Sequence, residues 1–471
     1  MQRPPLLFTF GIPIVIITSY LFLAFQHDLR TSVPALVGST AIVIISLTIV
    51  IYAGERKNIV WSPLLIISVA VLIRIPFLRR APELSDDIYR YVWDGLQMIK
   101  GCNPYSFAPA DIKLYGETSA VLLRHVNHPE LVTIYPPAAQ LVFALGSFLS
   151  GSVIGIKTVL VVMDIATCIL ILRFLSVMHV PAWRAVLYAW HPLPVIEIAG
   201  SGHIDSAGLL FLLLCLMLVV TGTKSPEPAL QLKGPLPSRF KKNLLFLSAG
   251  VVFACAVFVK LFPIIFLPAF IIFIPKQKSL IFLAGFLSGI LGLTLPFLPD
   301  FYNMVDTLSV YLQNWEFSNF AFQMLREMTS SGNSARLLLI AVFLSTLSFF
   351  SFSLFYRKRT YEGMSGNPSV LFIKTMYGIA FLYLLLTPTL YPWYALYLVC
   401  LFPFFAEPGG LIFSWSVFLS YYVLINYTLL GQWTENDTVT AGIWLASVAG
   451  SLLTLSIRTV MTDRLPKSNP S

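Results

Sequence analysis

Hydrophobic runs long enough to cross a lipid bilayer recur along almost the whole chain. A bilayer core of about 30 Å is crossed by roughly 20 apolar residues in a helix. In lipid, each such segment must satisfy its own backbone polar groups, so it folds as a helix. The sequence therefore predicts an all-α, polytopic membrane bundle, a single transmembrane domain over residues 1–471. The clear runs are 6–25, 35–53, 59–78, 158–175, 204–220, 280–297, 337–356, 371–386, 411–430 and 440–457.

Two other apolar segments leave the number of crossings open between 12 and 14. Segment 136–150 is apolar over only about 15 residues, which is short for a full crossing. It either re-enters the membrane or spans it as a short helix. Segment 244–274 is interrupted near Lys260 and Pro263. Because proline removes a helical hydrogen bond, this break is either a kink in one long helix or the tip of a hairpin.

Composition and charge support a membrane protein and suggest its orientation. Hydrophobic residues make up 57% of the chain and charged residues 11%, and the net charge is +9. The positive-inside rule places the basic clusters on the cytoplasmic side. The basic surplus is not interleaved with aromatic residues as nucleic-acid binding would need, so we expect no nucleic acid partner. The basic clusters are 56–57, 173 with 184, 224–242, 276–278, 357–359 and 458–467.

The same rule places two long polar segments, 79–135 and 299–333, on the external face of the cell membrane. Neither is long enough to form a core of its own. We expect the first to be a helical catalytic loop after the third span and the second to be a further external loop. A catalytic site in these loops would then face the periplasm or another extracytoplasmic compartment.

The first of these loops begins with an unusual density of acidic and aromatic side chains. Ser85 is a good N-cap and Lys100-Gly101 a good helix end, so a short helix is predicted over 86–100. Acidic residues in its first turn, Asp86 and Asp87, would stabilise the helix dipole even without another role.

The spacing within this helix allows two interpretations. Arg90 is four residues from both Asp86 and Asp94, which permits a simple ladder of ion pairs. Asp87, Tyr91 and Asp94 share one helical face, which instead suggests a site. A carboxylate at the rim of an apolar cavity has a raised pKa, as suits a general base. The prolines that follow, in Asn-Pro-Tyr at 103–105 and Tyr-Pro-Pro at 135–137, would stiffen the loop around it.

Several segments together resemble one enzyme superfamily. The first is SDDIYRYVWDG at 85–95, continued by GCNPYSFAP at 101–109 and HPELVTIYPPAAQL at 128–141. Further pieces are WHPLPVIEIAGSGHID at 190–205, VKLFPIIFLP at 259–268 and TPTLYPWY at 387–394. In this order, over about residues 59–406, they resemble polytopic glycosyltransferases of the GT-C superfamily. Bacterial transferases that use polyprenyl-phosphate sugars, often described as mannosyltransferases, are the most similar.

The resemblance implies a reaction and a base. Enzymes of this type place a catalytic aspartate in the first large external loop, where it deprotonates the acceptor hydroxyl and the sugar inverts in one displacement. Related aminoarabinose transferases carry Arg and Tyr three and four residues after the acidic position. Arg90 and Tyr91 lie three and four residues after Asp87. Asp87 is therefore the first candidate for the catalytic base, and Asp86 is the second. No cofactor is implied, and a metal is used by only some members, so none is expected.

Other side chains are candidates for substrate binding, each with a simpler alternative. His203 and Asp205 would bind sugar hydroxyls or assist the base, although Asp205 is equally suited to cap the next helix. Lys260, beside a helix-breaking proline, would bind the donor phosphate. Tyr391 and Trp393 would stack on a sugar or belong to an interfacial aromatic belt. The full predicted set is Arg90, Tyr91, Asp94, Tyr105, His203, Asp205, Lys260, Tyr391 and Trp393.

Two function classes follow. The first is a glycosyltransferase that moves a hexose, with mannose implied by the resemblance, from a polyprenyl-phosphate donor to an external glycan or glycolipid acceptor, with membrane lipid as a further partner. The second is a transporter or lipid flippase, in which the ionisable residues Asp164, Glu197 and Lys260 within apolar segments would line a transport path.

Overall fold

The computed structural model describes residues 10–56, 61–112, 117–223, 238–361, 367–406 and 408–462. Parts of three predicted basic clusters, at residue 57, within 224–237 and at 463–467, lie outside these ranges. The regular secondary structure of the described residues is helical, without a strand; an isolated bridge joins Phe317 and Thr389. The predicted all-α fold is therefore confirmed.

Eight helices in the described ranges are long and apolar enough to cross a membrane, which makes the chain a multi-pass membrane protein. Five apolar segments are shorter, and the predicted count of 12 to 14 crossings stays a prediction. The long ones are α2 (Val33–Glu55), α7 (Val153–Val177), α9 (Asp205–Thr223), α10 (Ser238–Val259), α12 (Lys276–Thr294), α15 (Gly332–Tyr361), α16 (Pro368–Leu386) and α18 with α19 (Pro408–Ser416 and Tyr422–Leu430). The short ones are α1 (Ile12–Ala24), α3 (Pro63–Leu78), α6 (Pro137–Leu149), Phe262–Phe273 with α11 (Leu267–Phe273), and Pro392–Phe404 with α17 (Leu396–Val399).

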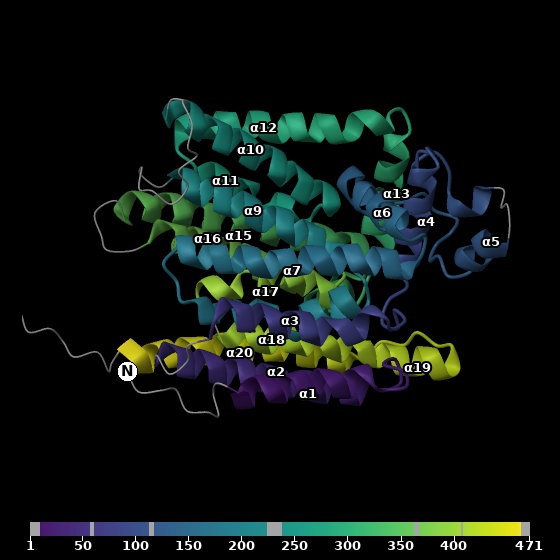
Figure 1. Cartoon of the computed structure of the whole chain (residues 1–471), viewed down its shortest axis with the longest axis horizontal. Helices are drawn as coiled ribbons and strands as arrows, with labels where there is room; N and C mark the ends of the chain where they lie inside the picture. Colours follow the sequence, from purple (N-terminus) through teal and green to yellow (C-terminus); the bar gives the residue numbers. More distant parts are fainter. Residues whose placement is uncertain are drawn as a thin grey trace, which may run out of the picture.

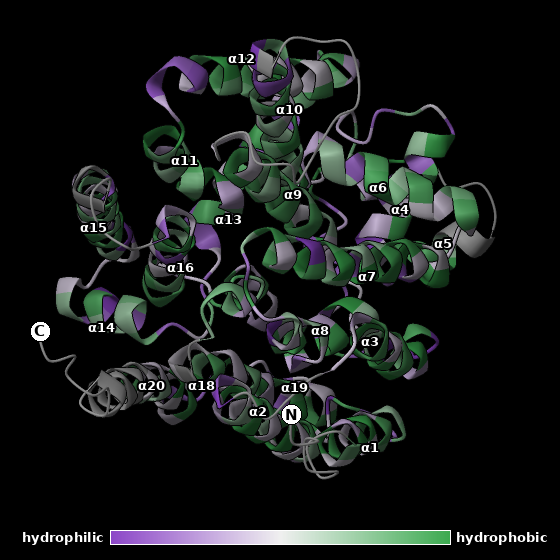
Figure 2. Ribbon diagram, turned by 60° about the vertical axis from the view of Figure 1, so that its left-hand side comes forward, coloured by the Kyte–Doolittle hydropathy of each residue, from purple (hydrophilic) through white to green (hydrophobic). Residues whose placement is uncertain are grey.

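Three of the remaining helices, α4, α5 and α13, lie at one end of this bundle. Figure 1 shows α4, α5, α6 and α13 at the end where α19 finishes, and we call this the loop end. In Figure 2 most of the bundle carries the apolar colour. The additional helices are α4 (Asp87–Ile99), α5 (Glu117–Leu123), α8 (Val186–Ala189), α13 (Phe301–Asn314), α14 (Phe320–Thr329) and α20 (Asp437–Thr462).

The short helix α6 re-enters the bundle from the loop end and does not carry the chain across it. It packs along α4, where Gln140 donates a hydrogen bond to Asp94 at 3.2 Å. The next helix, α7, then begins at the loop end again, since Lys157 near its start donates to the carbonyls of Phe77 and Arg80 at the end of α3. This decides between the two interpretations of segment 136–150.

The break at Lys260 and Pro263 is the tip of a hairpin. Helix α10 reaches the loop end at Val259, and Lys260 there pairs with Asp205, the first residue of α9. The chain then returns through α11 to the opposite end, where Lys358 donates to the carbonyls of Ile272 and Phe273. Proline at the tip forces this turn, because it cannot continue the hydrogen bonding of α10.

Small residues let the helices approach closely. Gly250 of α10 lies against the backbone of α12 at Phe282, and Gly285 of α12 lies against Leu247 of α10. Without a hydrophobic drive between helices in lipid, close packing of this kind provides much of the association. These two contacts hold α10 against α12.

A buried ion pair joins α3, α7 and α8. Nε of Arg74 lies 2.5 Å from a carboxylate oxygen of Asp164, and Tyr188 donates to the other oxygen at 2.6 Å. Arg74 also donates to the carbonyls of Ala70 and Ala189, so its donors are used within the bundle. The charges of Arg74 and Asp164 are tolerated inside the apolar bundle because each is paired with the other.

The contact of α4 with α6 yields a stability prediction. A Cβ at Gly95 would overlap the carbonyl oxygen of Phe143 and the hydroxyl of Ser147, whereas a Cβ at Gly292 of α12 meets nothing. Gly95→Ala should therefore destabilise the protein by about 1–3 kcal/mol through overpacking. Gly292→Ala, the matched control, should be neutral or slightly stabilising. Thermal unfolding in detergent micelles measures both, and an equal melting temperature for the two variants would refute the close contact.

Candidate active site

The first turn of α4 presents Asp87 at the loop end of the bundle. The helix begins one residue later than predicted, with Asp86 at the N-cap, and the Ser85 hydroxyl accepts from the Asp87 backbone N–H at 3.3 Å. At the other end Gly101 has a φ of 78°, as expected of a glycine that terminates a helix. The local sequence thus fixes where the carboxylate of Asp87 emerges.

Asp87 is partly exposed and held by named neighbours. Asn127 donates to one of its carboxylate oxygens at 3.0 Å, and the other oxygen lies 3.8 Å from Nδ1 of His203. Burial raises the pKa of the Asp87 carboxyl above its ordinary value. The positive charge of Lys260, and then the hydrogen bond from Asn127, oppose this rise. A carboxylate with a raised pKa and access to solvent is suited to accept a proton.

Behind Asp87 lies a second, fully buried carboxylate. Nε2 of His203 is 3.5 Å from Glu197, and Tyr421 donates to both oxygens of Glu197 at 2.9 and 3.0 Å. Only 1% of the His203 side chain is exposed, and neither of its ring nitrogens makes a hydrogen bond within the described chain. His203 therefore stands between two carboxylates, one open to the site and one closed.

The hairpin tip supplies the positive charge. Nζ of Lys260 lies 2.9 and 3.0 Å from the two oxygens of buried Asp205, and 4.7 Å from the ring centre of Tyr394. Lys260 remains 23% exposed while Asp205 is completely buried. The positive charge of Lys260 also acts on Asp87, whose pKa it lowers.

Aromatic rings form a continuous stack that ends at His203. Trp393 stacks on His203 with centroids 3.9 Å apart, Tyr391 on Trp393 at 4.5 Å, and Phe317 on Tyr391 at 4.8 Å. The stack is fixed by the pairing of 317 with 388–390, where Leu390 donates to the Phe317 carbonyl at 2.8 Å. Tyr391 and Trp393 thereby stand beside the site, packed ring on ring.

Three predicted residues lie elsewhere in α4 and its loop. Arg90 and Asp94 are buried against each other at 2.9 Å, and Arg90 also donates to the Leu131 carbonyl. Tyr105 is buried against Phe297 and donates to the Tyr135 carbonyl at 2.8 Å. Their contacts hold the loop together, as the ion-pair interpretation of the sequence anticipated for Arg90.

The two remaining residues differ in position. Tyr91 is buried and stacks on Phe143 with centroids 4.4 Å apart, so it anchors α4 to α6 beneath Asp87. Asp86 is exposed and makes no side-chain hydrogen bond among the described residues. Of the two adjacent aspartates, Asp87 is the one whose side chain faces His203 and Asn127.

Comparison with known proteins decides what kind of molecule carries this arrangement. The family model described as alpha-(1->6)-mannopyranosyltransferase, N-terminal domain, matches residues 16–276, more than half of the chain. The chain belongs to this mannosyltransferase family. No curated protein and no solved structure matches it.

Membership of the family makes this chain a glycosyltransferase and confirms the resemblance inferred from its motifs. The transporter alternative lacks this support, and all three of its ionisable residues have partners in the bundle, Glu197 through the hydroxyl of Tyr421. Asp164 is paired with Arg74, and Lys260 is paired with Asp205. The matched region contains Asp87, His203, Asp205 and Lys260 and excludes Tyr391 and Trp393.

Sequence reasoning did not assign several residues that contact the site of the transferase. Asn127 comes from the irregular part of the loop, and Tyr421 from a segment more than 200 positions after Glu197. Only their contacts reveal them. Glu197 carried a signal, since an isolated glutamate in an apolar run requires a partner.

The expectation that no metal is bound stays a prediction. In the described part of the transferase, no group of three or more His, Cys, Asp or Glu side chains is placed to hold an ion.

The pKa of Asp87 yields a pH prediction. A base must be deprotonated to act, so kcat should fall with decreasing pH through the raised pKa of Asp87, above the ordinary aspartate range. Asn127→Ala removes a hydrogen bond that lowers this pKa, and should move the acid limb of the kcat profile to higher pH. Asp86→Asn removes a neighbouring negative charge that raises this pKa, the least of its causes, and should move the limb slightly to lower pH. If Asn127→Ala leaves the acid limb of the kcat profile at the same pH, then the titration of Asp87 does not determine that limb.

Proposed function

We propose that this mannosyltransferase transfers mannose from a polyprenyl-phosphate donor to a glycan or glycolipid acceptor, with inversion and with Asp87 as the general base. The observation that carries the proposal is the placement of Asp87 and Lys260 at one site. A carboxylate with a raised pKa and a partly exposed ammonium are the two groups that this displacement needs.

The proton transfer is assigned to Asp87. Its carboxylate takes the proton of the acceptor hydroxyl as that oxygen attacks the anomeric carbon of the sugar. The oxygen that faces His203, and not the one that accepts from Asn127 at 3.0 Å, is assigned to receive the proton. Tyr135 is a further hydrogen-bond partner of this carboxylate. Solvent access to Asp87 makes it the better base than fully buried Glu197.

The leaving group is assigned to Lys260. As the new bond forms, the bond from the anomeric carbon to the phosphate oxygen breaks, and the polyprenyl phosphate leaves with the electron pair. A preorganised cation beside this developing charge is an effective means of stabilising the transition state. Asp205 holds Lys260 in place through two hydrogen bonds, which reduces its freedom before the donor binds.

Stereochemistry follows from a single displacement. The family description names an α-(1→6) linkage. One displacement inverts the anomeric centre, so an α-linked product requires a β-linked mannosyl phosphate as donor. A covalent sugar–enzyme intermediate is not needed, which agrees with one base facing the site.

The proposed location of the site is the external face of the cell membrane. Described basic residues gather at the end of the bundle opposite Asp87. Arg184 pairs with Glu55 at the end of α2, and Lys278 bonds Asn243 near the start of α10. The positive-inside rule supports a cytoplasmic position for that end and an external position for the loop end.

Removal of the base tests the proposal directly. Asp87→Asn should lower kcat by at least about 100-fold, since general base catalysis contributes that much or more. Donor binding should persist, because the cation at Lys260 is intact. The purified transferase is assayed with labelled polyprenyl-phosphate mannose, alongside Asp86→Asn as the neighbouring control. Near-normal transfer by Asp87→Asn would exclude it as the base.

Lys260 yields a separate prediction. Lys260→Met should raise the donor KM by about 10- to 100-fold, the range expected for loss of a hydrogen bond to a charged group. The acceptor KM should change little. Lys260→Arg, which keeps the charge, should recover much of the loss. If both variants bind the donor as the wild type does, the phosphate contact is wrong.

A further inference from the structure

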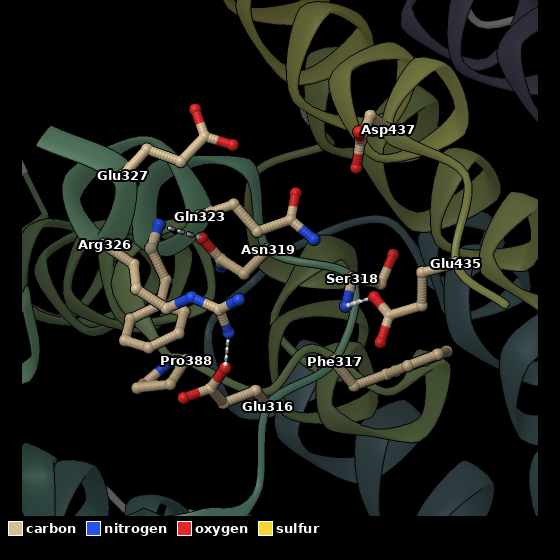
Figure 3. Close-up of a pocket in the computed structure, with 11 residues that line it drawn as sticks. Glu316, Phe317, Ser318, Asn319, Gln323, Arg326, Glu327, Pro388, Glu435 and Asp437 are labelled. Carbon is tan, nitrogen blue, oxygen red and sulfur yellow. Dashed lines mark hydrogen bonds and ion pairs between the residues drawn. The ribbon is translucent and has the colours of Figure 1, made fainter. Parts of the chain in front are cut away.

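A pocket of about 350 Å³, whose lining does not include Asp87, lies beside α14 and the start of α20 (Figure 3). This volume lies in the range of about 300–1,000 Å³ that small-molecule sites occupy. Its walls come from the segment between α13 and α14, from α14 itself and from the start of α20. The lining residues that the argument uses are Glu316, Phe317, Ser318, Gln323, Glu435 and Asp437.

The pocket is rich in groups that bind sugar hydroxyls. Carboxylates accept hydrogen bonds, and amides both donate and accept them. Among the described residues, the side chains of Gln323, Glu327 and Asp437 make no hydrogen bond or ion pair, so they are available to a ligand. Phe317 adds the apolar wall that such a site requires.

An orphaned hydroxyl provides a second, independent observation. Ser318 is only 3% exposed, and its hydroxyl has no partner in the described chain. Its φ of 49° places it in the left-handed region, held there by the hydrogen bond from its N–H to Glu435 at 2.7 Å. Strained backbone with an unsatisfied buried polar group is typical of binding sites.

Charge indicates which ligand the pocket takes. It is lined by four carboxylates, from Glu316, Glu327, Glu435 and Asp437, and by one guanidinium, from Arg326. Arg326 is itself paired with Glu316, and Arg336 adds a second pair to Glu316 at 2.8 Å. A phosphate would be repelled here, so the lipid-linked donor is disfavoured and a neutral glycan is favoured.

Two physical connections join this pocket to the transfer site. Phe317, which lines it, begins the ring stack through Tyr391 and Trp393 to His203 beside Asp87. A smaller pocket of about 160 Å³ shares Phe317, Ser318 and Glu435 with the first. Its residues Ser420 and Tyr422 flank Tyr421, the partner of Glu197.

We infer that this pocket is a subsite for the acceptor glycan, which binds sugar units remote from the hydroxyl that reacts at Asp87. The inference rests on the proposed transfer at Asp87. The acidic subsite lies at the Phe317 end of the ring stack, and the cationic Lys260 lies at the other end. The neutral acceptor and the anionic donor would therefore bind at different ends of the stack.

The test compares acceptors of different length with variants of the pocket. Gln323→Ala and Asp437→Ala remove groups that hold nothing else in the described structure. Their matched controls are Gln313→Ala and Asp306→Ala, exposed positions of α13 that do not line the pocket. The full chain in micelles is assayed with β-mannosyl-phosphoryl polyprenol and with α-(1→6)-linked mannobiose or mannotetraose.

We expect each pocket variant to raise the KM for mannotetraose by about 10-fold, the effect of losing one hydrogen bond. The KM for mannobiose, the donor KM and kcat should stay within about twofold. Equal mannotetraose KM values in pocket and control variants would overturn the subsite.

Direct binding separates this inference from the proposed base. Calorimetric titration of mannotetraose into Asp87→Asn protein should give the wild-type affinity, and adding Gln323→Ala should weaken it by about 10-fold. If Asp87→Asn still transfers mannose while the added substitution weakens binding, the base is wrong and the subsite stands. If Asp87→Asn is inactive and Gln323→Ala leaves binding unchanged, the base stands and the subsite is wrong.

Discussion

The ion pair of Lys260 with Asp205 is the interaction on which the site depends. It joins the tip of a proline-broken hairpin to the first residue of α9, two segments separated by 55 positions. Buried Asp205 needs a cation, because a lone carboxylate inside an apolar bundle is costly. The pairing that answers this need also brings Lys260 to the loop end, within the electrostatic reach of Asp87. One requirement for stability therefore sets the position of a group proposed to act on the substrate.

Charged side chains around Asp87 are paired less tightly than charged side chains elsewhere in the protein. Arg74 with Asp164 is a buried ion pair that joins α3 to α7, and Arg90 with Asp94 is a buried ion pair within α4. Around Asp87 the pairing is looser, since His203 lies 3.8 Å from it and Lys260 keeps an exposed face. A group that must exchange a proton or bind an anionic substrate cannot have all its hydrogen bonds and its charge satisfied by other protein groups. The looser contacts are the physical mark of the candidate site.

Much of the candidate site could be predicted from local sequence. Asp87 was the first choice among the acidic residues, and the structure places it, and not Asp86, beside His203 and Asn127. The break at Lys260 was visible from Pro263, although its outcome as a hairpin was not. Arg90 and Asp94 were ambiguous from spacing alone, because an i,i+4 pair has the same pattern whether it faces a substrate or the core. Asn127 and Tyr421 carried no local signal, since their roles arise from contacts over long chain separations.

The sequence by itself determined that the chain is a helical membrane protein with an acidic helix after a span, because hydrophobic length and helix capping act over a few turns. Its ordered motifs also indicated the transferase family, which the family match confirmed. Only the tertiary structure decided that α6 re-enters and that 260–263 is a hairpin tip. It alone brought together the ring stack that joins Phe317 to His203. Helices in an apolar solvent choose their neighbours by close packing and by pairing of buried charges, and both depend on residues distant in sequence.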